Sequence, residues 1–112
     1  MILANSVFIG SKFGIDIRDK ETGDALTDGT SLIKNNIYQS NTAGFADKEV
    51  VADGATLSFA SSALLRTYLT TNGNTFIDAT AAAALLNSPY TLGATPNFTL
   101  KTGSSAATGA SF

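Results

Sequence analysis

The chain has 112 residues, a length that suits one small domain and excludes a two-domain enzyme. Charged residues make up 14% of it, below the usual ~25%, and 7 basic against 9 acidic side chains leave a net charge of −2. Such a weakly charged chain has no electrostatic basis for binding nucleic acid or an acidic membrane surface, so neither is expected as a partner.

The sequence contains no histidine and no cysteine. Zinc sites built on thiolate and imidazole are therefore excluded, and so are catalytic groups that pair a serine or cysteine with a histidine. No catalytic, cofactor-binding or metal-binding set is predicted, and we expect a protein that is not an enzyme. The first residues show no signal peptide, and no window approaches the ~20 apolar residues of a membrane-spanning helix.

Strands are predicted in the first third of the chain. Residues 13–18 alternate apolar and polar side chains, a period of two that places Phe13, Ile15 and Ile17 on one face. Residues 5–10 and 31–38 are further strand-like segments. Residues 19–30 are rich in turn-forming types and contain Asp28-Gly29, so a loop is predicted between the strands.

Helices are predicted later in the chain. Apolar residues recur at helical spacing over 59–69, and Asn72-Gly73 ends that run. Asp78 is a suitable N-cap for a short helix over 79–87, which Ser88-Pro89 closes. From residue 89 to the end the chain is rich in turns, with one apolar stretch at 98–100.

A repeat links the first two strand regions at an offset of 30 positions. The aligned pairs are Leu3/Ile33, Asn5/Asn35, Ser6/Asn36, Val7/Ile37 and Phe8/Tyr38. A weaker third copy, at an offset of 38, aligns Asn74 with Asn36 and Phe76 with Tyr38.

The repeat predicts parallel strands that stack ~4.8 Å apart, with like side chains above one another and a ladder of asparagine amides at the bend. Phe8, Ile15, Ile17, Ile37 and Phe76 should then be buried. The alternative is that two asparagine-containing apolar strands match by chance.

The C-terminal segment sharpens this interpretation. Residues 89–112, which include Pro96-Asn97-Phe98 and Thr108-Gly109-Ala110, resemble the closing turn of secreted bacterial right-handed parallel β-helix proteins, the pectate-lyase-like superfamily. Asn5–Phe8 and Asn35–Tyr38 are similar to that family's strands. Ser105 departs from the pattern, since the family usually has proline there.

The resemblance implies a fold class and a location. The expected fold is all-β, a short right-handed parallel β-helix of about three to four coils with one or two small helical excursions. Residues 1–112 would form this single β-solenoid domain, with excursions near 59–70 and 79–87 and a closing turn over 89–112. The resemblance also implies an extracellular or cell-surface protein.

Asp16 and Arg18 are the candidate ligand face, because they project from the polar side of one predicted strand. In β-helix polysaccharide enzymes such residues bind uronates. The alternative is a solvated strand face with a weak ion pair. The acidic residues between 19 and 28 do not meet the calcium-loop pattern and fit turns better.

Four aromatic residues allow two interpretations. They could line a sugar-binding groove or belong to the core, and the core is the commoner outcome. They are Tyr38, Phe45, Phe59 and Tyr68.

The predicted function is a non-enzymatic, self-associating structural module that stacks through open strand edges. A contact of this kind that does not close into a ring extends into filaments. The predicted interface is an uncharged edge strand together with the apolar stretch near the C-terminus. Its residues are Ile2, Leu3, Val7, Phe8, Phe98 and Leu100. The partner would be another copy of the chain or upstream coils of a longer parent. The alternative function is the last coils of a larger carbohydrate-binding or polysaccharide-degrading β-helix, with a polysaccharide as partner.

Overall fold

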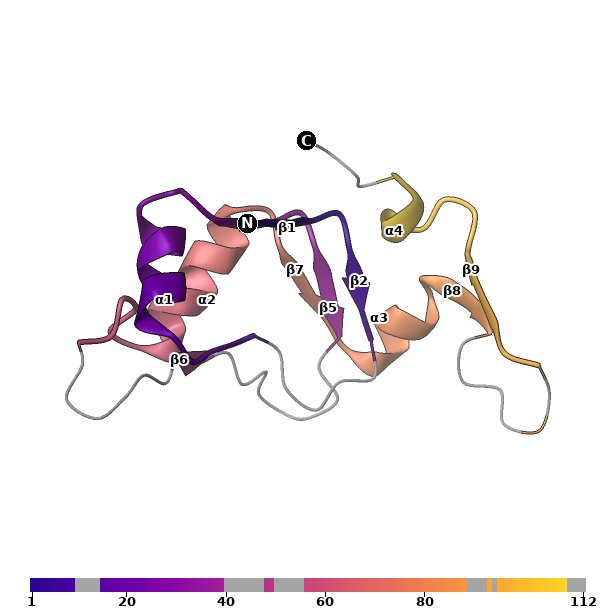
Figure 1. The fold of residues 1–112 in the computed structure, drawn as a ribbon. Helices are drawn as coiled ribbons and strands as arrows, with labels where there is room; N and C mark the ends of the chain where they lie inside the picture. The colour runs from indigo at the N-terminus through magenta and orange to yellow at the C-terminus, as the bar shows by residue number, and fades with distance from the viewer. Residues whose placement is uncertain (10–14, 40–47, 50–55, 89–92, 94, 109–112) are drawn as a thin grey trace.

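The computed structural model describes residues 1–9, 15–39, 48–49, 56–88, 93 and 95–108 (Figure 1). Strands of 2 to 4 residues alternate with four helices. The strands are β1 (Ile2–Ala4), β2 (Val7–Phe8), β3 (Asp16–Ile17), β4 (Leu32–Lys34), β5 (Ile37–Gln39), β6 (Lys48–Glu49), β7 (Thr75–Ile77), β8 (Leu86–Ser88) and β9 (Asn97–Leu100). The helices are α1 (Lys20–Thr27), α2 (Ser62–Thr71), α3 (Ala79–Ala83) and α4 (Ser105–Thr108).

Parallel pairing joins the repeated segments in the predicted register. β1 pairs with β4, and Leu3 lies opposite Ile33. β2 pairs with β5, and β5 pairs with β7, so that Phe8, Tyr38 and Phe76 occupy equivalent positions. The predicted parallel alignment of residues 3–9 with 33–39 is therefore confirmed.

The helices α2 and α3 begin at capping side chains. Ser61 Oγ accepts a hydrogen bond from the N–H of Leu64 at 3.3 Å, and Asp78 Oδ1 accepts one from Ala81 at 2.7 Å. Helix α3 ends at Ala83, earlier than the predicted residue 87, because residues 86–88 form strand β8.

The loop predicted for residues 19–30 is wrong, because helix α1 occupies most of it. Its apolar stripe is short: Gly23 and Leu26 are buried in it, and Leu26 belongs to the core. On its outer side Lys20 pairs with Asp24 one turn later. The residue types of this segment favour turns, but tertiary packing stabilises a helix there.

The core lies between the first strands and the helices α1 and α2. Its fully buried members are Leu26, Leu65 and Leu69, and the rest of the cluster is Ile17, Ile33, Tyr38 and Phe59. Of the residues predicted to be buried, Ile17 alone is buried, at 4% exposure. Phe8, Ile15 and Phe76 are half-buried against the core, and Ile37 is half-buried. Phe13, also placed on the apolar face, lies outside the described residues.

The predicted all-β fold, a short right-handed parallel β-helix, is wrong. The described residues form four small separate sheets, three parallel and one antiparallel, and contain neither a solenoid nor a closed sheet. The stacked strands do not continue, because the chain enters helices α1 and α2 between them and then turns into the antiparallel pair β8–β9. In the described residues parallel stacking therefore joins the repeated segments and the short pair β3–β6.

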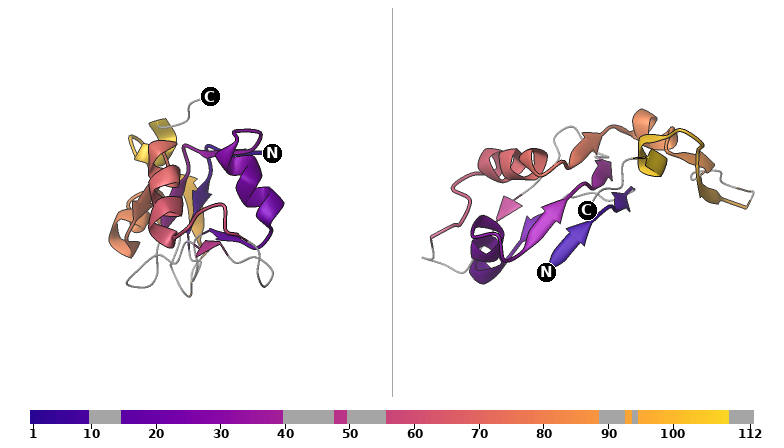
Figure 2. Two further views of the ribbon diagram at one scale, coloured as in Figure 1. Left: turned by 90° about the vertical axis from the view of Figure 1, so that its left-hand side faces the viewer. Right: turned by 90° about the horizontal axis from the view of Figure 1, so that it is seen from above.

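The molecule is elongated. Its extents are 49 × 29 × 19 Å, and its radius of gyration of 15.5 Å exceeds the ~13 Å of a compact chain of this length. Strands β8 and β9 form an arm that projects from the rest of the molecule (Figure 2). All four residues of β9 are exposed.

Candidate functional site

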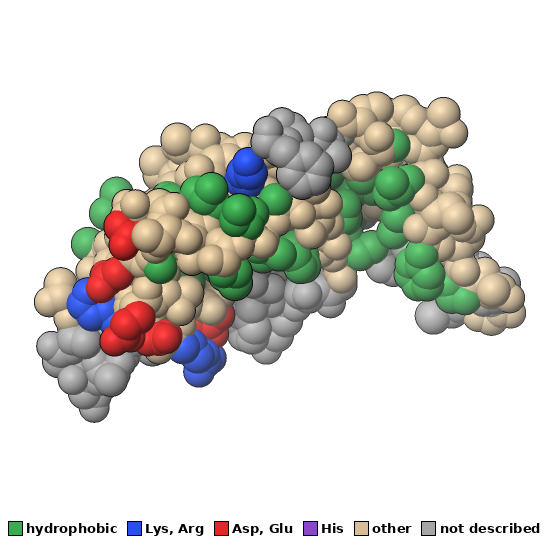
Figure 3. Space-filling model, turned by 45° about the horizontal axis from the view of Figure 1, so that its top comes forward, with side chains coloured by type: hydrophobic (Ala, Val, Ile, Leu, Met, Phe, Trp, Pro, Cys, Tyr) green, Lys and Arg blue, Asp and Glu red, His purple; other side chains and the backbone are tan. Residues whose placement is uncertain are grey.

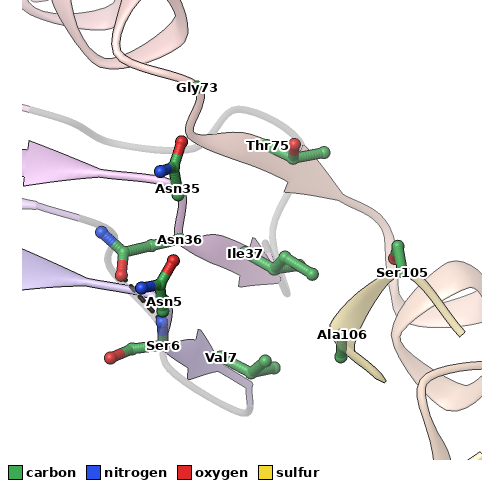
Figure 4. Close-up of a pocket in the computed structure, with 10 residues that line it drawn as sticks. All are labelled: Asn5, Ser6, Val7, Asn35, Asn36, Ile37, Gly73, Thr75, Ser105 and Ala106. Atoms are coloured by element: carbon green, nitrogen blue, oxygen red, sulfur yellow. Dashed lines mark hydrogen bonds between the residues drawn. The ribbon is translucent and has the colours of Figure 1, made fainter. Parts of the chain in front are cut away.

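The stacked strands turn at one repeated bend. Asn5 and Asn35 both have φ of +54°, and Gly73 at the equivalent position has φ of +75°. Asparagine and glycine are the residues that adopt this left-handed conformation at least cost. Figure 4 shows Asn5, Asn35 and Gly73 in one column at the bend.

Two buried asparagines connect the strands beside this bend. The Oδ1 atom of Asn36 accepts from the main-chain N–H of Ser6 at 3.0 Å, and its Nδ2 donates to the carbonyl of Leu3 at 3.0 Å. Asn74 repeats both bonds one strand later, to the N–H of Asn36 at 3.1 Å and the carbonyl of Ile33 at 2.7 Å. We call this arrangement the amide ladder; each amide reaches back to the preceding strand.

The ladder is closed at both ends within the chain. Ser6 occupies the first position, and its shorter side chain donates to the carbonyl of Ala4 at 3.1 Å instead of reaching outward. At the last position the N–H of Asn74 donates to the carbonyl of Leu69, near the end of α2. A further strand with the same bend, placed beside β2, would therefore receive no amide hydrogen bond from Ser6.

Aromatic rings form a second column. The rings of Phe8 and Tyr38 stack with centroids 4.9 Å apart and an interplanar angle of 7°, and Tyr38 and Phe76 stack at 5.4 Å and 19°. The guanidinium carbon of Arg66, on α2, lies 3.2 Å from the centroid of Phe76. A cation over a ring face is a favourable contact, so Arg66 closes the Phe76 end of the column.

The outer edge of β1 and β2 is the open side of the stack. Among the described residues β1 has β4 as its one sheet neighbour, and β2 has β5. The carbonyls of Met1 and Ser6 accept from Leu32 and Ile37 on the inner side. In a parallel pair the alternate residues, here Ile2 and Val7, direct their N–H and C=O groups to the other side.

The predicted interface residues fall into two groups. Ile2, Leu3, Val7 and Phe8 lie together along the open edge, where the side chain of Ile2 is 68% exposed. Phe98 and Leu100 lie on the arm and are also exposed, Phe98 at 63%. Figure 3 shows hydrophobic side chains exposed on the arm, whereas acidic and basic side chains gather at the opposite end of the molecule.

The predicted ligand face, Asp16 and Arg18, faces solvent as expected. Arg18 Nη2 donates to Asp16 Oδ2 at 2.7 Å, and Nε donates to the same oxygen at 3.0 Å. The two charges therefore neutralise each other on the strand.

The acidic residues of the α1 region are engaged with neighbouring donors. Hydrogen bonds from Lys20 Nζ and Ser58 Oγ hold the pKa of Asp24 below its ordinary value. Bonds from the N–H and hydroxyl of Thr30 lower the pKa of Asp28 in the same way. In the described part of the chain no three acidic residues lie close enough to hold a metal ion.

Of the four aromatic residues considered for a sugar groove, Tyr38 and Phe59 are core residues, as the commoner interpretation predicted. Tyr68 is half-buried against them, and Phe45 lies outside the described residues. The three described rings therefore form no surface row for stacking on a sugar.

A small pocket lies beside the bend, with a volume of about 160 Å³. Val7, Ile37 and Thr75 form one wall, and Ser105 and Ala106 of α4 face them (Figure 4). Ligand pockets usually measure about 300–1,000 Å³, so this one is too small for a typical small-molecule ligand.

A wider hollow of about 400 Å³ runs between α3 and residues 101–105. Of the described residues that line it, Lys101 is the one ionisable side chain. Neither cavity brings together groups that would carry out acid–base chemistry.

The sequence did not predict the contact of Arg66 with the ring of Phe76, or the hydrogen bond from the Asn74 N–H to the carbonyl of Leu69. The spacing of Arg66 on the predicted helix gave no sign of which ring it would meet. The ladder itself was signalled by the repeated asparagines.

Comparison with known proteins gives no relative: no family model, no curated protein and no solved structure matches this chain. The resemblance of residues 89–112 to β-helix proteins therefore has no independent support. In the described residues no helix is long and apolar enough to cross a membrane.

Proposed function

We propose that this chain is a non-enzymatic structural module that associates with further copies of itself through its open strand edge. The observation that carries the proposal is the edge formed by β1 and β2, which has sheet neighbours on its inner side alone among the described residues. An open edge is a template for a further strand, and natural proteins usually protect it.

The chemistry of this edge supports association. Residues 1–9 contain no charged side chain and no proline, the two features that most often block strand addition. The exposed Ile2 adds apolar area at the edge. Each main-chain hydrogen bond to a docking strand would contribute about 0.5–1.5 kcal/mol.

The arm supports the same proposal from the other side. A two-stranded antiparallel pair is marginally stable by itself, because it has no core of its own. β9 exposes Phe98 and Leu100, and the arm makes the molecule longer than a compact domain. A partner that covers these side chains would supply the missing burial.

The non-enzymatic part of the proposal rests on the absence of histidine and cysteine from the sequence. The extracellular or cell-surface location rests on the resemblance alone. The alternative, a carbohydrate-binding part of a larger protein, has no structural observation in its favour, since Asp16 and Arg18 pair with each other.

Two substitutions test the edge. Ile2→Lys and Val7→Lys each place a charge on it, and Thr70→Lys places the same charge on an exposed position of α2 as the control. Size-exclusion chromatography with multi-angle light scattering measures the molar mass over a range of concentrations.

The wild-type chain and the control should show a molar mass that rises with concentration, while the two edge variants stay closer to the monomer. Circular dichroism verifies that the variants are folded. A wild-type chain that remains monomeric at high concentration, or edge variants that associate as well as the control, would disprove the proposal.

A further inference from the structure

Among the described residues, the aromatic column is closed at one end and open at the other. Arg66 covers Phe76, whereas Phe8, the first ring, stacks on Tyr38 and lies at the open edge. Phe8 is half-buried. A strand added beside β2 would lie ~4.8 Å away, a spacing close to the 4.9 Å between the rings of Phe8 and Tyr38. The side chain next to Phe8 on that strand would therefore meet its ring.

The amide ladder adds no hydrogen bond to a strand that docks on this edge. In the stack each amide reaches back to the preceding strand, and Ser6, at the first position, supplies no amide. In a second copy the last strand of the stack is β7, and its bend N–H, that of Asn74, already donates to the carbonyl of Leu69. A docking strand is therefore held by main-chain hydrogen bonds and side-chain contacts alone, and it does not need the bend.

Strand β9 offers what such a contact needs. It has 4 residues, it is paired with β8 on one side through an irregular register, and it presents an exposed aromatic ring at Phe98. Residues 97–100 carry no charge, as residues 1–9 carry no charged side chain, so the two surfaces do not repel. The next residue, Lys101, directs its ammonium group to the carbonyl of Ala83 at 3.3 Å.

We infer that β9 of a second copy is the strand that pairs with β2, and that its Phe98 stacks on Phe8 and extends the column. This inference rests on the proposed self-association and specifies its contact. The contact joins two different surfaces of the chain, so it is heterologous, and it forms either open chains or a closed ring.

The first test separates the ring from its hydrophobicity. Phe98→Leu keeps an apolar side chain without the ring, and Phe98→Tyr keeps the ring. Because an aromatic pair contributes beyond the area it buries, Phe98→Leu should weaken association about threefold to tenfold, and Phe98→Tyr should stay within about twofold of wild type. Sedimentation equilibrium measures the dissociation constants.

The second test uses the absence of native cysteine. With Phe98 beside Phe8, Val7 lies beside Thr99 or Asn97 of the other copy, depending on strand direction. Mixtures of Val7→Cys with Thr99→Cys, and of Val7→Cys with Asn97→Cys, should give a mixed disulfide in one of the two cases, because neighbouring strands meet disulfide geometry. Val7→Cys mixed with Thr70→Cys, on exposed α2, is the control and should give none.

The results separate this inference from the proposed function. A strictly monomeric wild-type chain overturns both. A wild-type chain that associates overturns only the inference if Phe98→Leu binds as tightly as wild type. The same holds if neither mixture cross-links above the control, or if Val7→Cys cross-links mainly to itself, which would show two β2 edges in contact.

Discussion

The Oδ1 atom of Asn74 accepts two hydrogen bonds from Asn36, one from its main-chain N–H at 3.1 Å and one from its side-chain Nδ2 at 2.9 Å. Both residues are buried, Asn36 completely. Two strands 38 positions apart in the chain are thus held in register by polar groups that no water reaches. A buried polar network of this kind stabilises the fold only while every group has its partner.

The first prediction concerns Asn36→Ala. The substitution removes the acceptor of the Ser6 N–H and the donor to the Leu3 carbonyl, so two part-buried groups lose these bonds. We expect a loss of about 2–4 kcal/mol in the free energy of unfolding, measured by urea denaturation followed by circular dichroism.

Asn87→Ala is the matched control, because the Asn87 amide also makes a bond, to Thr99 Oγ1 at 2.7 Å, but on an exposed side chain. Its loss should stay below about 1 kcal/mol. Equal losses for the two variants would mean that the amide ladder does not stabilise the fold.

The second prediction compares two glycines that follow helices. Gly73 and Gly29 have φ of +75° and +82°, so alanine is strained at both. At Gly73 an added β-carbon would also collide with Oδ1 of Asn35, whereas at Gly29 nothing lies within 4 Å. Gly29→Ala should cost about 1 kcal/mol, and Gly73→Ala about 0.5–1.5 kcal/mol more, because the end of the Asn35 side chain must turn away from the new β-carbon.

Removing the obstacle tests the cause. Asn35→Gly keeps the left-handed bend accessible and deletes the colliding side chain. The double variant Asn35→Gly, Gly73→Ala should therefore lose less than the sum of the two single losses, as substitutions in contact do. Additive losses would show that the collision is absent.

The repeat made the register of β1, β2, β4, β5 and β7 predictable from the sequence. Asparagine at a left-handed bend followed by β-branched and aromatic residues is a local signal, and the structure repeats it at Asn5 and Asn35. Parallel stacking follows from that signal because like side chains pack on one another in register.

The global fold did not follow from the same signal. A few similar strands do not specify how many more follow. The segments that connect them, which include helices α1 and α2, determined the fold. Leu26 is buried in a segment whose Asp, Thr and Gly residues favour turns, so tertiary packing overrode local preference. The antiparallel pairing of β8 with β9 depends on contacts between residues 86–88 and 97–100, which no periodicity in either strand specifies.

The uncharged edge of β1 and β2 was predictable from the sequence, but the Arg66 contact at the end of the aromatic column was not. Absence of charge over residues 1–9 is visible in the sequence. The Arg66 contact with Phe76 requires the placement of α2 over the strands, which is a three-dimensional property.

The third prediction is a dependence of stability on pH through Asp24. Its pKa is lowered in the folded state, so the carboxylate stabilises the fold above the unfolded pKa of ~3.9, and this contribution is lost as the pH falls through the lower folded value. Asp24→Asn should therefore be less stable than wild type at pH 7, and the difference should shrink toward pH 2.

Ser58→Ala is the companion variant. It removes the hydroxyl donor at 2.6 Å but leaves Lys20 in place, so it should show a smaller difference at pH 7 that also declines in acid. Urea denaturation at pH 7, 5, 3 and 2 measures both. A difference between wild type and Asp24→Asn that is constant over this range would exclude the stabilising role of the carboxylate.

The fourth prediction ranks the aromatic column by burial. Tyr38 has a ring stacked on each face and is 4% exposed, so Tyr38→Ala should cost about 3–5 kcal/mol in the free energy of unfolding. Phe8 has Tyr38 on one face and is half-buried, so Phe8→Ala should cost less, about 2 kcal/mol, when measured in dilute solution.

The cost of Phe8→Ala should also depend on protein concentration, because a second copy that covers Phe8 stabilises the wild-type fold by mass action and the variant much less. The thermal midpoint of the wild-type chain should rise with concentration, and that of Phe8→Ala should rise less. Tyr38 lies inside the column, where a second copy does not cover it. Most of the stability lost in Tyr38→Ala should therefore be lost at every protein concentration. A gap between wild type and Phe8→Ala that is the same at low and high concentration would place Phe8 outside any contact between copies.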